Sequence, residues 1–330
     1  MKAPCLLVLA IALLSPQNAP VSKHFRLTKM APGIWAAIHN DDYGRAICNA
    51  GIIDLGDKTI IFDPFMTPEA AKDLKKLAKQ LTGDDRLLVV NSHFHNDHIR
   101  GNQVFAAEAS IISTQWTRNK MVFSEPDEQQ WEKENAGPLA AAERKKLKTV
   151  TGREKEETIL WLAYYEGILK SLPELKLTLP DITFSDSLWI HGKDRSIRLI
   201  EFKNGHTPSD IGLFIPQDRI AFMGDLFFVQ RHPWLGDGDP EEWKKILDYL
   251  LTTPIDTFVP GHGPIGGKKE LQPLRDYISD VQTVVNEGFK TGLPDSVILK
   301  AHVPEKYSEW WFGRFYSYNV RSLVRRARKG

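Results

Sequence analysis

Three histidines and an aspartate fall within six residues of one another, in the segment HFHNDH (93–98). The run before it, RLLVVNS, has the composition of a short buried strand. Alternate side chains of an extended chain point to the same side, so His93 and His95 can reach one metal ion. A turn at the following Asn-Asp pair would then present Asp97 and His98 beside them. Four ligands from one loop are too many for a single tetrahedral ion that keeps an open position, so the pattern indicates two ions.

Three further polar residues follow predicted strands later in the chain and could complete such a site. They are His206, Asp225 and His262, and each is preceded by a glycine. Glycine lets the backbone approach a crowded centre closely. A carboxylate such as Asp225 can bridge two cations, because it offers one oxygen to each.

This set of motifs, in this order, resembles the metallo-β-lactamase-fold hydrolases over roughly residues 30–290, apart from a helical insertion. The resemblance implies an αββα sandwich with the site at the edge of the sheets. It places a first metal on His93, His95 and His206. It places a second metal on Asp97, His98 and His262, with Asp225 as the bridge.

The ligand set is more similar to the glyoxalase II and lactonase branches than to true metallo-β-lactamases, which generally lack the bridging aspartate. The flavodiiron branch has Glu where this sequence has His95, which argues against di-iron chemistry. Five histidines with two carboxylates suit two Zn²⁺ ions, although manganese or iron would also fit nitrogen and oxygen donors.

The expected reaction is hydrolysis of a carbonyl compound by a metal-bridging hydroxide. Zinc lowers the pKa of a bound water from about 15.7 to about 7, so hydroxide is present at neutral pH. The substrate would be a lactone, thioester, ester or β-lactam, and the resemblance implies that Asp97 takes up the nucleophile's proton. Asp63 could accept a hydrogen bond from the ring N–H of a ligand histidine or could cap local backbone. His232 and Trp234 could line the pocket or belong to an ordinary loop.

The sequence is also compatible with two other functions. The chain could be a mononuclear iron oxidoreductase similar to persulfide dioxygenases, with His93, His206 and Asp225 as ligands; four of the seven candidate ligands would then have little to do. It could also be a non-catalytic binding protein stabilised by metal, which predicts a closed site. Structural zinc sites are usually rich in cysteine, and this motif set contains none.

The order of predicted elements is strands, helices, strands, helices, which indicates an α+β fold with two sheets face to face and helices outside. We expect one domain over residues 21–330. It would include a helical insertion at 115–178, which could pack on the scaffold as a helical hairpin or form a lid that shapes a substrate pocket, and a helical C-terminal segment at 268–330. In the insertion, one helical face is predicted to carry Ile159, Leu162, Tyr165, Ile168, Leu169 and Leu172.

The chain has 43 Lys and Arg against 42 Asp and Glu, so it lacks the basic field that nucleic acid or an anionic membrane requires. We therefore expect a small-molecule substrate as its partner. Residues 1–20 are typical of a signal peptide, with the apolar run LLVLAIALL too short to span a bilayer. Export would place the protein in the periplasm or outside the cell; without it, the protein would be cytoplasmic. Cys48 is expected to be a small buried hydrophobic residue.

Overall fold

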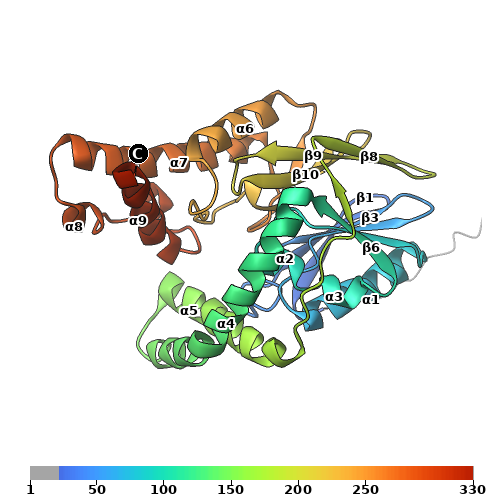
Figure 1. The fold of residues 1–330 in the computed structure, drawn as a ribbon, viewed down its shortest axis with the longest axis horizontal. Coiled ribbons are helices and arrows are strands. Elements are labelled where there is room, and N and C mark those ends of the chain that lie inside the picture. Colours follow the sequence, from blue (N-terminus) through green and yellow to red (C-terminus); the bar gives the residue numbers. More distant parts are fainter. Residues whose placement is uncertain (1–21, 330) are drawn as a thin grey trace, which may run out of the picture.

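Two β-sheets packed face to face lie between outer layers of helices in the computed structural model, which describes residues 22–329 (Figure 1). The predicted αββα sandwich is therefore confirmed. The predicted signal segment, residues 1–20, lies outside the described residues.

The first sheet has seven strands in chain order. The first four pair antiparallel and the rest are parallel. Strand β1 was not predicted, because its residues after Phe25 mix polar and apolar side chains and are half-exposed. The strands are β1 (Phe25–Ala31), β2 (Ile34–His39), β3 (Ala50–Asp54), β4 (Thr59–Phe62), β5 (Leu87–Val90), β6 (Ala109–Thr114) and β7 (Ile182–Phe184).

The second sheet has six strands, with β8 and β13 at its edges. Its strands are β8 (Ser187–His191), β9 (Ser196–Lys203), β10 (Ser209–Ile215), β11 (Ile220–Phe222), β12 (Thr257–Val259) and β13 (Gly266–Gly267). The core between the sheets consists of aliphatic and aromatic side chains from both. Gly51 on β3 makes the close approach possible, since a Cβ there would lie 2.7 Å from the ring of Phe222 on β11.

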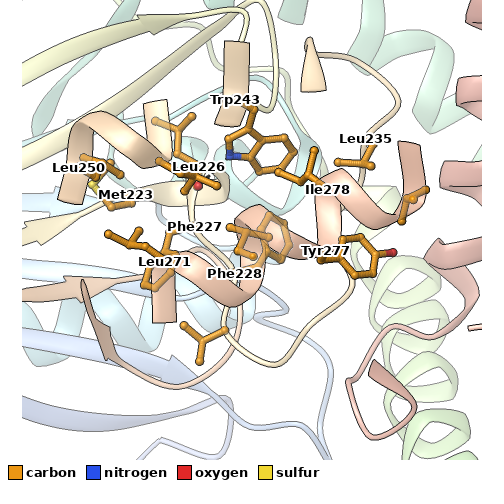
Figure 2. Close-up of a cluster of buried hydrophobic side chains, with 14 of the residues drawn as sticks. Met223, Leu226, Phe227, Phe228, Leu235, Trp243, Leu250, Leu271, Tyr277 and Ile278 are labelled. Atoms are coloured by element: carbon orange, nitrogen blue, oxygen red, sulfur yellow. Dashed lines mark hydrogen bonds between the residues drawn. The ribbon is translucent and has the colours of Figure 1, made fainter. Parts of the chain in front are cut away.

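Helices cover the outer faces of both sheets. On the first sheet lies α1 (Pro68–Thr82), which begins with Thr67 as N-cap and proline at its first position; α2 (Asn96–Ile99) and α3 (Asn102–Phe105) follow strand β5. On the second sheet lie α6 (Pro240–Thr252), capped by Asp239, and α7 (Lys268–Lys290). Figure 2 shows the apolar cluster between these two helices and the chain after β11, including Phe227, Trp243 and Ile278.

Residues 115–178 form a helical hairpin of α4 (Gln115–Lys146) and α5 (Gly152–Ser171), followed by η1 (Leu172–Glu174). The predicted apolar face of α5 is partly wrong: Leu160 and Trp161 are buried, whereas Leu169 is 40% exposed. The reason is that α5 packs against two partners, α4 and the C-terminal segment, so its buried stripe is displaced.

The C-terminal segment contains α8 (Asp295–Ile298), η3 (Glu305–Tyr307) and α9 (Arg314–Lys329). In Figure 1, α9 faces the α4–α5 hairpin across one end of the sandwich. Arg314 ties the two together through its 2.7 Å contact with Glu143, and the amide of Gly313 donates to Glu157 at 2.9 Å. Within residues 22–329, no helix is both long and apolar enough to cross a membrane.

Candidate metal centre

All seven candidate ligands meet at one edge of the sandwich. His93 and His95 follow β5, and Asp97 and His98 lie on the short helix α2. The other three come from the second sheet: His206 lies between β9 and β10, Asp225 lies in η2 (Gly224–Leu226) after β11, and His262 follows β12. Two sheets thus contribute to one site, as the sequence predicted.

The first group of ligand atoms surrounds a point between His93, His95 and His206. Nδ1 of His95 lies 3.0 Å from Nε2 of His93 and 3.0 Å from Nε2 of His206. These atoms and a carboxylate oxygen of Asp225 all lie within 4.8 Å of one another. Such a spacing suits three imidazoles and one carboxylate around a single ion.

The second group consists of Asp97, His98 and His262. Nε2 of His98 lies 3.4 Å from Oδ2 of Asp97, and Nε2 of His262 lies 3.3 Å from the same oxygen. Both imidazole nitrogens are also close to Asp225, at 3.2 and 3.3 Å from Oδ1. The donor atoms again converge from separate segments.

Asp225 connects the two groups. Its Oδ1 faces His98 and His262, while its Oδ2 lies 3.4 Å from Nε2 of His206 and 3.9 Å from Nε2 of His93. Each carboxylate oxygen therefore points at a different set of imidazoles. This is the arrangement that a bridging ligand requires.

Two glycines allow the centre to be this crowded. A Cβ on Gly261 would lie 1.9 Å from Oδ1 of Asp225. Gly224 has φ +51°, and a Cβ there would lie 2.5 Å from Oγ of Ser92. The glycines before His262 and Asp225 are thus required by the close approach of three chain segments.

On each of the five histidines, the ring nitrogen that faces away from the cluster has a hydrogen-bond partner. His93 contacts Ser92 Oγ at 2.9 Å, His98 contacts Asp63 at 2.8 Å, and His95 contacts Asp237 at 3.0 Å. The other two partners are backbone oxygens, from Trp234 for His206 and from Ile47 for His262. Such partners fix the orientation of an imidazole and direct its other nitrogen at a metal.

Asp63 lies behind a candidate ligand, which agrees with the first of the two roles considered for it. Besides His98 it accepts hydrogen bonds from the amide and the hydroxyl of Ser92, both at 2.7 Å. It is fully buried, with φ +54°. One carboxylate therefore orients His98 directly and His93 through Ser92.

The residues fit a pair of divalent cations. Nε2 of His98 and Oδ1 of Asp225 are buried and have no hydrogen-bond partner among the described residues, although they lie 3.2 Å apart. Burial lowers the pKa of His206 to about 3, against the attraction of Asp225, so this ring is neutral with a free lone pair. Burial alone would raise the pKa of Asp225, but His262 and His98 hold it well below its usual value.

His262 lies beside two carboxylates that favour a positive charge on its ring. Burial opposes that charge, yet Asp225 and Asp97 raise the pKa of His262 to about 9. A metal ion binds the neutral imidazole, so its binding would release this proton and its affinity would depend on pH.

Cys48 is buried as predicted, but it lies next to the second group of ligands. Its thiol donates to the backbone oxygen of Asp97 at 2.9 Å, and its sulfur belongs to a potential ligand set with Asp97 and His98. Burial raises the pKa of the thiol to about 12, so the group is protonated. Its role in this geometry is to fix the backbone of a ligand.

A cavity of about 140 Å³ opens beside the cluster. Of the two residues that could line the pocket or belong to an ordinary loop, Trp234 lines it. His232 does not: it is 1% exposed and packs with Tyr277, Trp310 and Tyr316. Its burial follows from the aromatic cluster of the C-terminal segment, which the local sequence around it does not reveal.

The sequence did not single out several other residues around the cavity. Glu128 from α4 and two aromatic residues of α5, Trp161 and Tyr164, line it, as do Phe312 and Phe315 near the start of α9. Tyr307 and Trp310, earlier in the same C-terminal segment, pack in the hydrophobic core instead.

Comparison with known proteins gives the family. A family model described as the metallo-beta-lactamase superfamily matches residues 43–262. A linear primary-alkylsulfatase from Pseudomonas sp. is 23% identical over 299 residues, which cover 84% of this chain and 54% of that protein. A metallo-beta-lactamase type 2 from Bacteroides fragilis is 26% identical over 111 residues, covering 32% of this chain and 45% of that protein. The chain spans about half the length of the curated relatives it matches.

Solved structures agree on the fold. The stereoselective inverting sec-alkylsulfatase Pisa1 from Pseudomonas sp. aligns with a TM-score of 0.63 at 15% identity, over 92% of this chain and 50% of that chain. A metallo-beta-lactamase from Pontibacter korlensis aligns with a TM-score of 0.55 at 16% identity, over 78% of this chain and 99% of that chain. The family model matches more than half of the chain, and the cluster of histidines and carboxylates agrees with it: the chain belongs to the metallo-beta-lactamase superfamily.

Proposed function

We propose that this protein is a dinuclear zinc hydrolase that cleaves a carbonyl substrate, namely a lactone, thioester, ester or β-lactam. The observation that carries the proposal is the position of Asp225, whose two oxygens face two separate groups of imidazoles. A bridging carboxylate between two such groups has no purpose in a site for one ion.

The candidate ligands would hold the two ions in two groups, and Asp97 would also act as a proton acceptor. His93, His95 and His206 would hold one ion, and His98 and His262 with Asp97 would hold the other. When bound, two zinc ions supply an acidified water as nucleophile and a Lewis acid for the carbonyl oxygen. Asp97, which lines the cavity, would take up the proton released from the nucleophile.

The aromatic lining of the cavity supports turnover rather than a purely structural site. Apolar walls exclude water and leave room for one substrate group beside the ligands. A site that only stabilises the fold would be closed around its ions, whereas this cluster borders a cavity. Cleavage of a small molecule also agrees with the near-neutral charge of the chain, and the apolar N-terminal run supports export to the periplasm or beyond.

Hydrolysis of alkyl sulfate esters is a second candidate. It is supported by the alkylsulfatase relative, which aligns with 84% of this chain. The same nucleophile and the same apolar cavity would serve a sulfate ester, so the active-site residues do not discriminate between the two ester classes.

The test is a hydrolysis panel on the full-length chain with metal quantified by elemental analysis. The panel contains lactones, thioesters, carboxylic esters, β-lactams and alkyl sulfates. We expect about two zinc ions per chain and turnover of at least one class, reduced at least a hundredfold in Asp225→Ala. One iron per chain with oxygen consumption would instead support the dioxygenase-like alternative. Turnover that survives complete removal of metal would overturn the proposal.

A further inference from the structure

Aromatic rings from three separate segments line the cavity beside the candidate metal ligands. Trp161 and Tyr164 come from α5, Trp234 from the loop before α6, and Phe312 and Phe315 from the C-terminal segment. At about 140 Å³ the space is comparable to a cavity that holds a benzene-sized molecule. It therefore fits one compact group of a substrate whose reacting bond lies at the ligands.

One carboxyl group that is not among the candidate ligands also lines this cavity, that of Glu128 on α4. Its Oε1 accepts a hydrogen bond of 2.8 Å from the amide of Asn96, which stands between two candidate ligands in the sequence. Asn96 is 6% exposed and is itself a cavity residue. The carboxyl group is thus held in a fixed position beside the site.

The carboxyl group of Glu128 lacks a cationic partner. The nearby guanidinium of Arg100 is taken by two other acids of the same helix, at 2.6 Å from Glu125 and 2.8 Å from Glu132. Within residues 22–329, no lysine or arginine lies within 4.0 Å of the Glu128 carboxylate, and none lines the cavity. Three carboxyl groups therefore share one positive charge.

The charges around Glu128 favour the binding of a cation in the cavity. Burial raises the pKa of Glu128 to about 7; Arg100 opposes the rise, and Glu132 and Glu125 add to it. His95 also faces the group and favours its ionised form. A positive group inside the cavity would stabilise the carboxylate, whereas an anionic group would be repelled.

We propose that this cavity binds an organic cation, a substituted ammonium group carried by the substrate, between the aromatic rings and the carboxylate of Glu128. The faces of aromatic rings attract such cations most strongly where water is excluded. That the cation belongs to a substrate rests on the function proposed above; the binding of the cation itself does not.

The decisive experiment measures binding without turnover. Tetramethylammonium is titrated into the full-length chain, with and without zinc, by isothermal titration calorimetry, and tert-butanol serves as a neutral probe of similar shape. We expect saturable binding of the cation, at least tenfold tighter than that of the alcohol. Equal binding of both probes, or no binding of the cation, would overturn the proposal and identify the cavity as a hydrocarbon site.

Two variants separate the carboxylate from general effects on the fold. Glu128→Gln keeps the hydrogen bond with Asn96 but removes the charge, and should weaken cation binding about tenfold while leaving the alcohol unaffected. Glu134→Gln is the matched control, since Glu134 is an exposed acid on the same helix and does not line the cavity. Unchanged cation affinity in Glu128→Gln would contradict the role of the carboxylate.

A pair of esters then connects the cation site to the reaction. Acetylcholine and 3,3-dimethylbutyl acetate have nearly the same shape and differ in charge. If the chain hydrolyses esters, kcat/KM should favour the cationic ester about tenfold, and Glu128→Gln should abolish the preference. Cation binding without hydrolysis of either ester would count against carboxylic esters as the substrate class and leave the cation site intact.

Discussion

Nε2 of His95 lies 3.0 Å from Oδ2 of Asp237, so a carboxylate from the loop before α6 holds the ring from behind. His95 differs from the other four candidate histidine ligands, because it presents Nδ1 rather than Nε2 to the cluster. Asp237 also accepts from the indole of Trp234 at 2.7 Å. The same carboxylate therefore orients a candidate ligand and a wall of the cavity.

Replacing Asp237 by asparagine should weaken metal binding at the first group of ligands. Without the carboxylate, the imidazole of His95 is a poorer donor and less well oriented, and losses of 10- to 100-fold in metal affinity are typical of such changes. Competition for zinc with a fluorescent chelator measures this directly. Asp186→Asn, at an exposed residue of a distant turn, is the control; if both variants bind zinc equally, Asp237 has no such role.

Gly261→Ala should lower the metal content of the protein. A Cβ at this position would lie 1.9 Å from Oδ1 of Asp225 and would push the bridge away from His98 and His262. We expect fewer than two zinc ions per chain by elemental analysis, with an unchanged circular dichroism spectrum.

Gly137→Ala provides the matched control for that change. Gly137 lies within α4, and a Cβ there has no neighbour within 4 Å. Its metal content should equal that of the unchanged chain. Full zinc occupancy in Gly261→Ala would show that the crowding around Asp225 is not essential.

Arg100→Met should destabilise the fold strongly. Arg100, Glu125 and Glu132 are nearly inaccessible to solvent, and removal of the guanidinium would leave two buried carboxyl groups without a cation. Breaking such a pair costs about 3–5 kcal/mol, which urea unfolding followed by circular dichroism can measure. Arg144→Met, which breaks an exposed pair with Glu166, should cost at most about 1 kcal/mol. Similar losses in the two variants would contradict this difference.

His232 should make the fold sensitive to acid. Burial lowers its pKa from 6.5 to about 4, so the unfolded chain takes up a proton at this residue over a range where the folded chain does not. Stability is therefore lost as the pH falls from about 6.5 to about 4, by up to roughly 3 kcal/mol. His232→Phe should show a smaller fall in the free energy of unfolding over that interval. An identical fall in both proteins would mean that the folded chain takes up a proton at His232 as readily as the unfolded chain does.

The convergence of the seven candidate ligands could be predicted from the sequence, because their segments follow strands. Strand ends are set by local apolar runs and by turn residues, and the two sheets bring their ends to one edge. The position of Asp63 could be predicted in the same way, since it directly follows β4. Its contact with His98 depends on the parallel pairing of β4 with β5.

The residues that the sequence did not single out depend on contacts between distant segments. Glu128 is one of many acids on a charged helix, and only the packing of α4 beside α2 brings it to the cavity. Asp237 lies 142 residues from His95. The sequence could not decide between pocket and loop for His232 for the same reason, since Tyr277 of α7 and Trp310 of the C-terminal segment bury it.

Anomalous diffraction from zinc-soaked crystals of the full-length chain would show whether the carboxylate of Asp225 bridges two ions. We expect two zinc peaks per chain about 3.5–4 Å apart, with one oxygen of Asp225 beside each. A single peak at full zinc occupancy, or two peaks that Asp225 does not join, would mean that the chain has no bridged pair of ions.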